Sequence, residues 1–164
     1  MGTTHFDSVS GINGLYVGKR GSEIKVAGPS GQLYESGSAV HAMKKATGAL
    51  AAVDTGGGIF SWANPEPGPI IVQHVALVVT TKTTGACSAD VGTTATSATT
   101  SSDNLIDGKD INAAAGTFTN LESAGTNGKA GQRLASGKWV TASMVAGGAT
   151  AGLVGTYEIY YTVL

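Results

Sequence analysis

The second half of the sequence, from Ile59 onward, consists of short apolar runs separated by clusters of Gly, Thr, Ser, Asn and Ala. Apolar runs of this length, bounded by turn residues, are typical of β-strands. We predict strands at residues 59–63, 70–81, 87–91, 116–121, 131–134, 138–145 and 157–164. Strands at this spacing predict an all-β fold, a jelly-roll-like β-sandwich.

The longest apolar run, residues 70–81, has apolar side chains at both odd and even positions. It therefore predicts a central strand that is covered on both faces. One face carries Ile71, Val75, Leu77 and Val79, and the other carries Ile70, Val72, Ala76 and Val78. Because the turn residues Thr83, Thr84 and Gly85 follow, we expect this strand to form a hairpin with residues 87–91.

The strand-like segment at residues 157–164 alternates strictly between two kinds of side chain. Tyr157, Ile159, Tyr161 and Val163 point one way, and Glu158, Tyr160 and Thr162 point the other. This alternation predicts a strand with one buried face.

The first fifty residues predict an N-terminal extended or hairpin arm. Residues 23–26 alternate charged and apolar side chains, as in a strand with one face in water, and the Gly and Pro of residues 27–31 predict a turn. We therefore divide the chain into an arm, residues 1–50, and a β-sandwich body, residues 51–164.

Helical signals occur in two short segments. Residues 38–53 predict either a short helix capped by Ser38 or a pair of short strands near Val40 and Leu50. Gly48 lies inside this segment and disfavours the helix. Residues 103–108 predict a single helical turn closed by Gly108.

Charge is scarce along the whole chain. Charged residues make up 13% of the sequence, and ten basic and eleven acidic side chains give a net charge of −1. Such a balance is too weak to hold a phosphate backbone by counterion release, so we expect no nucleic-acid partner. With 25 glycines and few charges, the surface must be built from Thr, Ser, Asn and Gly, which suits a protein packed against neighbours.

Signals for export, membrane insertion and disulfide bonding are missing from the sequence. Residues 1–20 contain no apolar stretch of signal-peptide length, and the apolar run at 70–79 is far shorter than the roughly 20 residues of a membrane span. Cys87 is the only cysteine, so an intrachain disulfide is excluded, and we expect it to act as a small core hydrophobe. We expect synthesis in the cytoplasm and no membrane partner.

No segment carries a catalytic signature. None of the Gly-Lys pairs is followed by Ser or Thr, as a phosphate-binding loop requires. The one acidic cluster, Asp103, Asp107 and Asp110, lacks the residue order of a calcium loop, and we expect Asp103 to cap the helical turn. His74, among apolar neighbours, is expected to be a core or interface histidine. We therefore expect no enzyme, no catalytic residue, no cofactor and no metal.

Several turn-rich stretches of the second half resemble one family of proteins. They are Asn64-Pro65, Thr83-Thr84-Gly85-Ala86-Cys87, Asp90-Val91-Gly92, residues 100–108, residues 125–129 and residues 134–141. Together they resemble the head decoration, or cement, proteins of tailed bacteriophages. The resemblance covers residues 59–164 and implies a jelly-roll-like sandwich that binds the major capsid protein on the outside of the virion. It implies no cofactor and brings no catalytic residues.

From this resemblance we expect a structural virion protein that is made in the host cytoplasm and stabilises the shell by bridging major capsid protein subunits. We also expect a homo-oligomer, a trimer, because local threefold positions occur on an icosahedral shell. The apolar side chains of the arm are the expected capsid or subunit interface: Phe6, Ile12, Leu15, Tyr16, Ile24, Val26 and Tyr34.

Two other classes stay open on the same pattern. One is a secreted hydrolase, which would need a cleft with carboxylates of perturbed pKa. A host-attachment or carbohydrate-binding module of a head or tail fibre would also be a β-sandwich, with exposed aromatic rings. Trp62 and Trp139 are the candidates for such rings, although core packing explains them as well.

Overall fold

The computed structural model describes residues 43–53, 57–98, 102–122, 124–128, 131–145 and 149–164, and the backbone of residues 34–35 and 38–39. The chain divides into two compact units, Met1–Val40 and His41–Leu164. In the first unit, β1 (Tyr34–Glu35) pairs antiparallel with β2 (Ser38–Ala39). The second unit is the body and holds all the other described strands.

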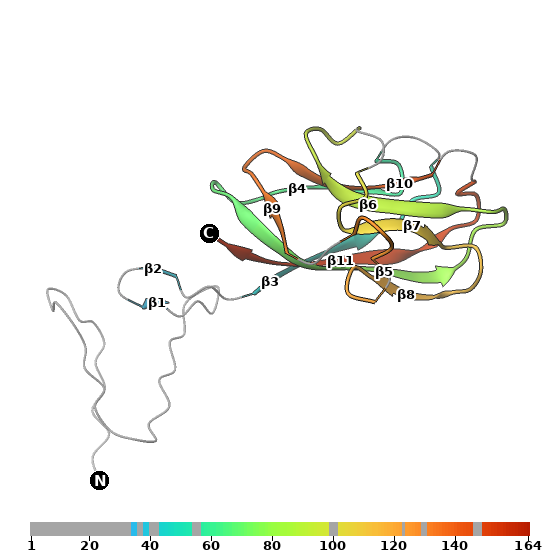
Figure 1. Ribbon diagram of the computed structural model, residues 1–164, viewed down its shortest axis with the longest axis horizontal. Helices are drawn as coiled ribbons and strands as arrows, with labels where there is room; N and C mark the ends of the chain where they lie inside the picture. Colours follow the sequence, from blue (N-terminus) through green and yellow to red (C-terminus); the bar gives the residue numbers. More distant parts are fainter. Residues whose placement is uncertain are drawn as a thin grey trace, which may run out of the picture. The chain divides into compact units, whose positions relative to one another are not determined.

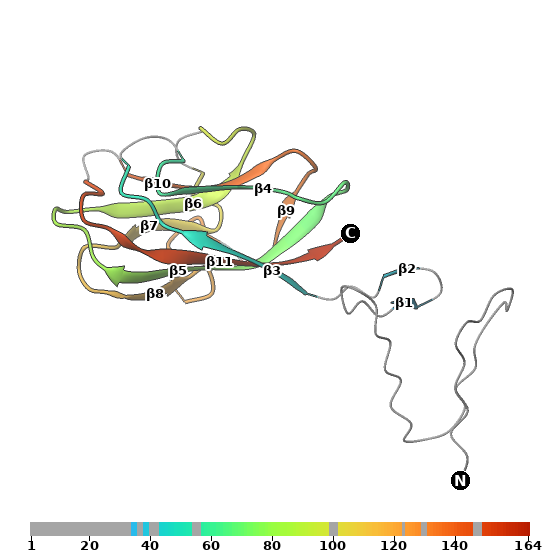
Figure 2. The same cartoon turned by 180° about the vertical axis from the view of Figure 1, so that it is seen from behind.

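The body is all-β, as predicted, and its strands form two antiparallel sheets (Figure 1). The strands are β3 (Lys44–Ala49), β4 (Phe60–Ala63), β5 (Ile70–Thr81), β6 (Ser88–Thr94), β7 (Ile106–Asp110), β8 (Gly116–Thr119), β9 (Gln132–Leu134), β10 (Trp139–Met144) and β11 (Val154–Val163). The four-stranded sheet has the order β4-β10-β6-β7, and the five-stranded sheet has the order β3-β11-β5-β8, with β9 also pairing with β5. Figure 2 shows the two sheets from behind as two layers.

One hydrophobic core fills the space between the sheets. Its fully buried side chains include Ile59, Val91 and Val140 from the four-stranded side and Leu77 and Ile159 from the five-stranded side. Alternate residues of β6 and β10, such as Ala89 and Val91 or Val140 and Ala142, point into the core, which is the packing expected for two sheets face to face. The described residues contain no helix, and therefore none that is long and apolar enough to span a membrane.

β5 lies at the centre of its sheet, but only one of its faces is buried throughout. Its fully buried side chains change phase: Val72 is followed by Val75, three positions later. The register explains this change, because Tyr160 pairs with His74 and Tyr161 with Val72, which leaves Gln73 without a counterpart on β11. Such a β-bulge turns the following residues to the opposite face. The prediction that both faces of this strand are covered therefore holds only in part: on the outer face Ala76 is buried, whereas Ile71 and Val78 are half-buried.

The predicted hairpin between residues 70–81 and 87–91 is also wrong. β5 belongs to the five-stranded sheet and β6 to the four-stranded sheet, so the chain crosses between layers at residues 82–87. Both strands present an apolar face, and each face is buried only when the two strands lie in opposite layers. The strand boundaries of β5, by contrast, are those that the sequence predicts.

Two expected helical segments are extended instead. Residues 44–49 form β3, which pairs along its whole length with β11, so the strand alternative for this segment is the better one. Residues 106–110 form β7, in which Gly108 has a φ of 61°. Because β3 belongs to the body, the division of the chain lies between residues 40 and 41 and not at residue 50.

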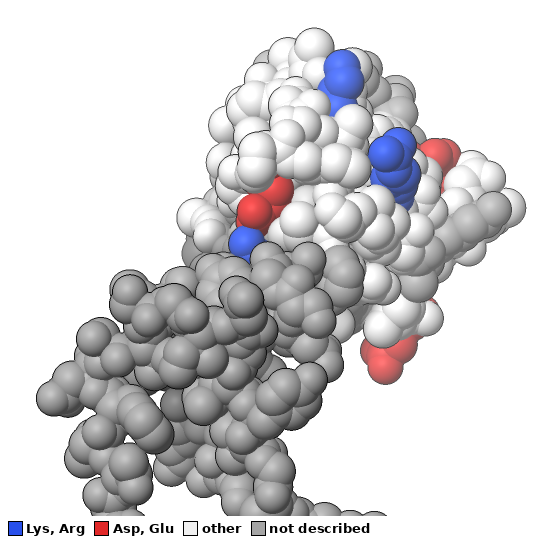
Figure 3. All heavy atoms as spheres, turned by 90° about the vertical axis from the view of Figure 1, so that its left-hand side faces the viewer, with Lys and Arg blue, Asp and Glu red and all other residues white. Residues whose placement is uncertain are grey.

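Three polar side chains on the outer face of the four-stranded sheet are buried, although this face does not face the core. Thr141 and Ser143 on β10 and Asp90 on β6 are all below a tenth exposed. The loops above them provide the cover: Gly57 N–H donates to Ser143 Oγ at 2.9 Å, and a Cβ on Gly92 would collide with Ser102. In Figure 3, the described part of the visible surface is mostly uncharged, with a few Lys, Arg, Asp and Glu side chains.

Candidate functional site

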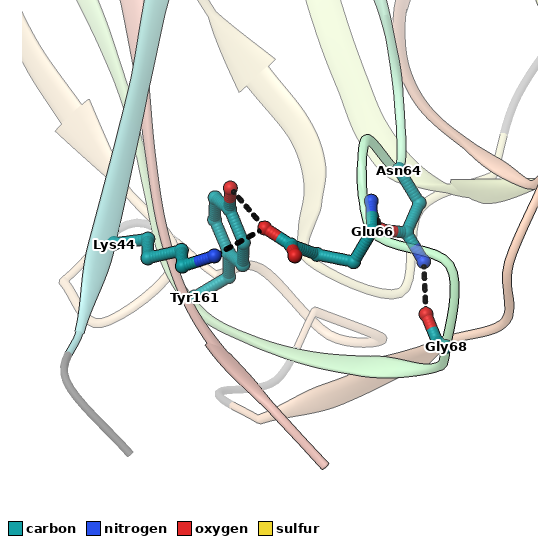
Figure 4. Close-up of polar contacts among 5 residues, drawn as sticks. All are labelled: Lys44, Asn64, Glu66, Gly68 and Tyr161. Atoms are coloured by element: carbon teal, nitrogen blue, oxygen red, sulfur yellow. Dashed lines mark hydrogen bonds and ion pairs between the residues drawn. The ribbon is translucent and has the colours of Figure 1, made fainter. Parts of the chain in front are cut away.

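The most connected polar site lies at the start of β3, where the body begins. Lys44 Nζ contacts Glu66 Oε1 at 2.7 Å, and the Tyr161 hydroxyl donates to the same oxygen at 3.1 Å (Figure 4). Glu66 belongs to the loop between β4 and β5, and Tyr161 lies near the end of β11. We call Lys44, Glu66 and Tyr161 the corner clamp, because they join three segments that are distant in sequence.

Asn64 shapes the loop that carries Glu66. Its Nδ2 donates to the carbonyl oxygens of Gly68 at 3.0 Å and Ala135 at 3.1 Å, and its Oδ1 accepts from Glu66 N at 2.9 Å. The loop contains Pro65, Pro67 and Pro69, which have no N–H to donate, so a regular ladder of backbone bonds is impossible there. The buried side-chain amide of Asn64 therefore makes the hydrogen bonds that a neighbouring strand would otherwise make, and it fixes the position of the Glu66 backbone.

The corner clamp is a structural site by its chemistry. Burial and the hydrogen bond to Glu66 raise the pKa of Tyr161 to about 12, so the phenol stays neutral at physiological pH. The Glu66 carboxylate is shared between an ammonium and a hydroxyl, and the ring of Tyr161 lies 5.2 Å from that of Trp62. These groups hold each other in place where the chain passes from the N-terminal unit into β3.

A second polar cluster lies on the outer face of the five-stranded sheet. Lys45 Nζ contacts Glu158 Oε1 at 2.7 Å, and the Tyr160 hydroxyl donates to Glu158 Oε2 at 2.9 Å. Tyr160 is directly opposite Lys45 on β3 and His74 on β5. Its ring stacks on His74 at 5.5 Å, and Lys45 Nζ lies 5.4 Å from the ring centroid.

The ion pair between Lys45 and Glu158 keeps both of these side chains charged. The hydrogen bond to Lys45, followed by that to Tyr160, lowers the pKa of Glu158, and the hydrogen bond to Glu158 raises the pKa of Lys45. Both groups are therefore charged at neutral pH and neutralise one another. Because β11 lies between β3 and β5, Lys45 and His74 flank Tyr160 from opposite sides. The sequence pattern does not reveal this cluster, because only the register of three strands brings its residues together.

The two tryptophans occupy different places. Trp62 packs against the core, in agreement with the core interpretation. Trp139 lies on the outer face of the four-stranded sheet, opposite Ala63 on β4 and Thr94 on β6, and is outside the core cluster. For Trp139 the core interpretation is therefore wrong.

The acidic side chains at residues 103–110 are used to fix loops. Asp107 Oδ2 accepts from the N–H groups of Thr126 and Asn127, and Asp110 Oδ1 accepts from the N–H of Asn112 at 2.8 Å. Asp103 Oδ2 accepts from Asn127 Nδ2 at 2.9 Å and caps no helical turn. Among the described residues no three His, Cys, Asp or Glu side chains lie close enough together to hold a metal ion.

Asp90 is the most buried carboxyl group of the described body. Burial raises its pKa, the nearby Asp107 and Asp103 raise it further, and the hydrogen bond from Gly108 N–H opposes them. Cys87, the lone cysteine, lies in the core with Ala89 and Val91, where it acts as a small apolar side chain. His74 Nε2 is buried and has no hydrogen-bond partner in the described part of the chain.

The interface residues that the sequence predicts in the arm lie outside the described residues. This applies to Phe6, Ile12, Leu15, Tyr16, Ile24 and Val26, and to the side chain of Tyr34, whose backbone belongs to β1. The sites built above are therefore those of the body alone. Comparison of the chain with protein-family models, with curated proteins and with solved structures gave no match.

Proposed function

We propose that this chain is a structural virion protein that binds the outside of a tailed-phage capsid and stabilises the shell by bridging major capsid protein subunits. The observation that carries the proposal is the division of the chain into an N-terminal unit, Met1–Val40, and an all-β body. The corner clamp supports it, because Lys44, Glu66 and Tyr161 brace the strand through which a pull on the N-terminal unit would reach the body.

A two-part protein suits this role on physical grounds. A protein that binds only the assembled shell shifts the equilibrium toward assembly. Two weak contacts, one through an arm and one through a body, raise the overall affinity because the second contact forms at high effective concentration. The low charge of the chain fits a surface that packs against protein neighbours.

Further details of the proposal come from the sequence and from its resemblance to decoration proteins. The body has jelly-roll-like connectivity, residues 1–50 include an arm that contacts the capsid, and the protein is a homotrimer at local threefold positions. Its partners are the major capsid protein and further copies of itself, with no nucleic acid and no membrane. The contacts are made by the apolar arm residues named above, and the protein is made in the host cytoplasm, has no cofactor and is not an enzyme.

Purified virions provide the direct test. The phage whose genome encodes this chain should contain it on the capsid at a copy number that matches the symmetry of the shell. Limited protease or antibody labelling of intact particles should reach it from outside. Its absence from purified particles, or its presence only in the tail, would contradict the proposal.

Deletion of residues 2–35 tests the role of the arm. The truncated protein should stay soluble and melt cooperatively, because every strand of the described core lies beyond residue 43. It should bind empty capsids much more weakly than the full chain in a co-sedimentation assay. Equal binding would move the contact to the body, and failure to fold would make the arm a structural part of the domain.

Trp139 favours a second candidate, the carbohydrate-binding or host-attachment module. Its ring lies on an outer face beside Ala63 and Thr94, without charged neighbours in register, and such a ring can stack on a sugar. Binding of the full chain to a panel of host surface glycans, lost in Trp139→Ala and kept in Trp62→Phe, would support this function over capsid decoration.

A further inference from the structure

The open edge of β3 is the strongest unexplained feature of the body. β3 is the first strand in the order β3-β11-β5-β8, and no strand of the described residues pairs with its other side. It runs for six residues, Lys44–Ala49, with an unbroken register to β11 and without proline. An edge of this kind presents unpaired N–H and C=O groups to any strand that approaches.

The register shows which backbone groups are open. Leu50 N–H donates to Gly155 C=O at 2.9 Å, so Leu50 and Gly155 form a hydrogen-bonded pair. In an antiparallel ladder such pairs recur at every second residue, which assigns the bonds to β11 to residues 44, 46, 48 and 50. The backbone groups of Lys45, Thr47 and Ala49 therefore point away from β11, and the side chains of these same residues are exposed.

The other outer strands of the described body are shorter or covered. β4 has four residues and runs into the prolines that follow Asn64, and β8 has four residues. β7 is covered by the loop at 124–128: Asp107 N–H donates to Ala124 C=O at 2.9 Å, and the Asp107 carboxylate binds the next turn. β3 is thus the one long, regular edge that this part of the chain leaves open.

We propose that β3 pairs antiparallel with β3 of a second copy of this chain, with the twofold axis at Thr47. In this register Thr47 faces Thr47 of the second copy, and Lys45 faces Ala49 of the second copy. The three residues with open backbone groups then form three hydrogen-bonded pairs, each exchanging two bonds. The two five-stranded sheets become one continuous sheet across the axis. Because a twofold contact cannot close a trimer, in the proposed trimer it joins a subunit of one trimer to a subunit of another.

The charge of Lys45 favours this register over the one in which the twofold axis lies at Lys45. Moving the axis to Lys45 would place two lysines opposite each other, and like charges opposite one another in a sheet are destabilising. With the axis at Thr47, each Lys45 keeps its own contact to Glu158 and faces a small side chain. Thr–Thr pairs are favourable in antiparallel sheets. The side chains of this edge are therefore self-complementary and suit a second copy of the chain, and this inference does not depend on the capsid proposal.

Cysteine cross-linking of the full chain tests the register. In Thr47→Cys the two thiols would lie on directly opposed residues about 5.5 Å apart between Cα atoms, which a disulfide accepts. Ala49→Cys is the register control, because the two cysteines would be four residues out of step, roughly 14 Å apart. Thr156→Cys is the edge control: it is exposed on β11, with both β3 strands between the two thiols.

The expected result is a disulfide-linked pair on mild oxidation for Thr47→Cys and only background for Ala49→Cys, Thr156→Cys and the wild type, whose Cys87 is buried. Equal cross-linking of Thr47→Cys and either control would overturn the inference. So would no cross-linking at position 47.

A second variant tests the pairing without added thiols. Thr47→Pro removes an N–H that points away from β11, so it costs the folded body no hydrogen bond, and proline is tolerated on edge strands. We expect this variant to unfold cooperatively, with a melting temperature at or below that of the wild type, and to sediment at half the mass of the wild type, while Thr47→Ser keeps the full mass. A wild type that sediments as the same species as Thr47→Pro would also overturn the inference.

Discussion

The bulge in β5 leads to a prediction that three threonine substitutions can test. Val72, Val75 and Val78 are spaced by three residues, and in a regular strand each step of three reverses the face. The bulge at Gln73 lies between the first two, so Val72 and Val75 share the core face while Val78 lies on the outer face. We therefore expect Val72→Thr and Val75→Thr to be destabilising and Val78→Thr to be tolerated.

The size of the effect follows from burial. Val72 and Val75 are 0% exposed, and threonine replaces a methyl group with a hydroxyl of nearly the same volume. A buried hydroxyl without a partner costs about 1–3 kcal/mol in proteins. At the partly exposed Val78 the hydroxyl reaches water, and a change within about 0.5 kcal/mol is expected.

Urea denaturation at one fixed protein concentration measures these differences. With a slope of about 2 kcal/mol/M for a chain of this size, a loss of 2 kcal/mol lowers the midpoint by about 1 M. Trp62, which packs against the core, reports unfolding by its fluorescence. If Val72→Thr were as mild as Val78→Thr, the phase change at the bulge would be wrong. If all three were equally severe, both faces of β5 would be covered, as the sequence alone suggests.

Three further predictions concern single side chains. Gly48→Ala should lower the free energy of unfolding by about 1–3 kcal/mol, because a Cβ there would lie 2.7 Å from ring atoms of Tyr157 and push that ring away from Phe60, on which it stacks; thermal melts check this, and an unchanged melting temperature would contradict it. The raised pKa of Tyr161 means that its stabilisation is complete below pH 10 and lost as pH rises toward about 12, so melting temperature should fall there less steeply in Tyr161→Phe than in wild type. Asp90→Asn should raise the melting temperature at pH 7 and lose this advantage as the carboxyl becomes protonated at low pH, because burial raises the pKa of Asp90; a variant less stable at pH 7 would show that the charge is needed.

The features that could be predicted best from the sequence are those that depend on a single strand. Residues 70–81 are long, apolar and bounded by turn residues, and β5 has those bounds. The alternation on β11 is also confirmed, with Ile159 and Tyr161 buried and Glu158 and Tyr160 more exposed. These features depend on local periodicity, which any sheet containing the strand must satisfy.

Pairing between distant strands could not be derived in the same way. Nothing local says that β5 and β6 lie in different sheets, or that Lys44 meets Glu66 and Tyr161. The bulge at Gln73 could not be predicted either. Apolar residues at both odd and even positions fit a strand that is covered on both faces, and they fit equally a strand whose buried face changes partway along. For β3, Gly48 inside the segment was the one useful hint, because glycine weakens a helix and here makes room for Tyr157.

The central position of β11 has a consequence for how the body is made. β11 lies between β3 and β5, so these two strands, although synthesised early, have no direct contact with each other in the five-stranded sheet. Until residues 154–163 leave the ribosome, β3 and one side of β5 remain without a neighbour, and pairings between residues so far apart in sequence form slowly. A nascent chain that stalls before residue 154 therefore carries an incomplete sheet in which β3 and the apolar strand β5 both lack their shared neighbour. Such a chain is a target for chaperones and proteases, and only a chain that has passed this point can close its core.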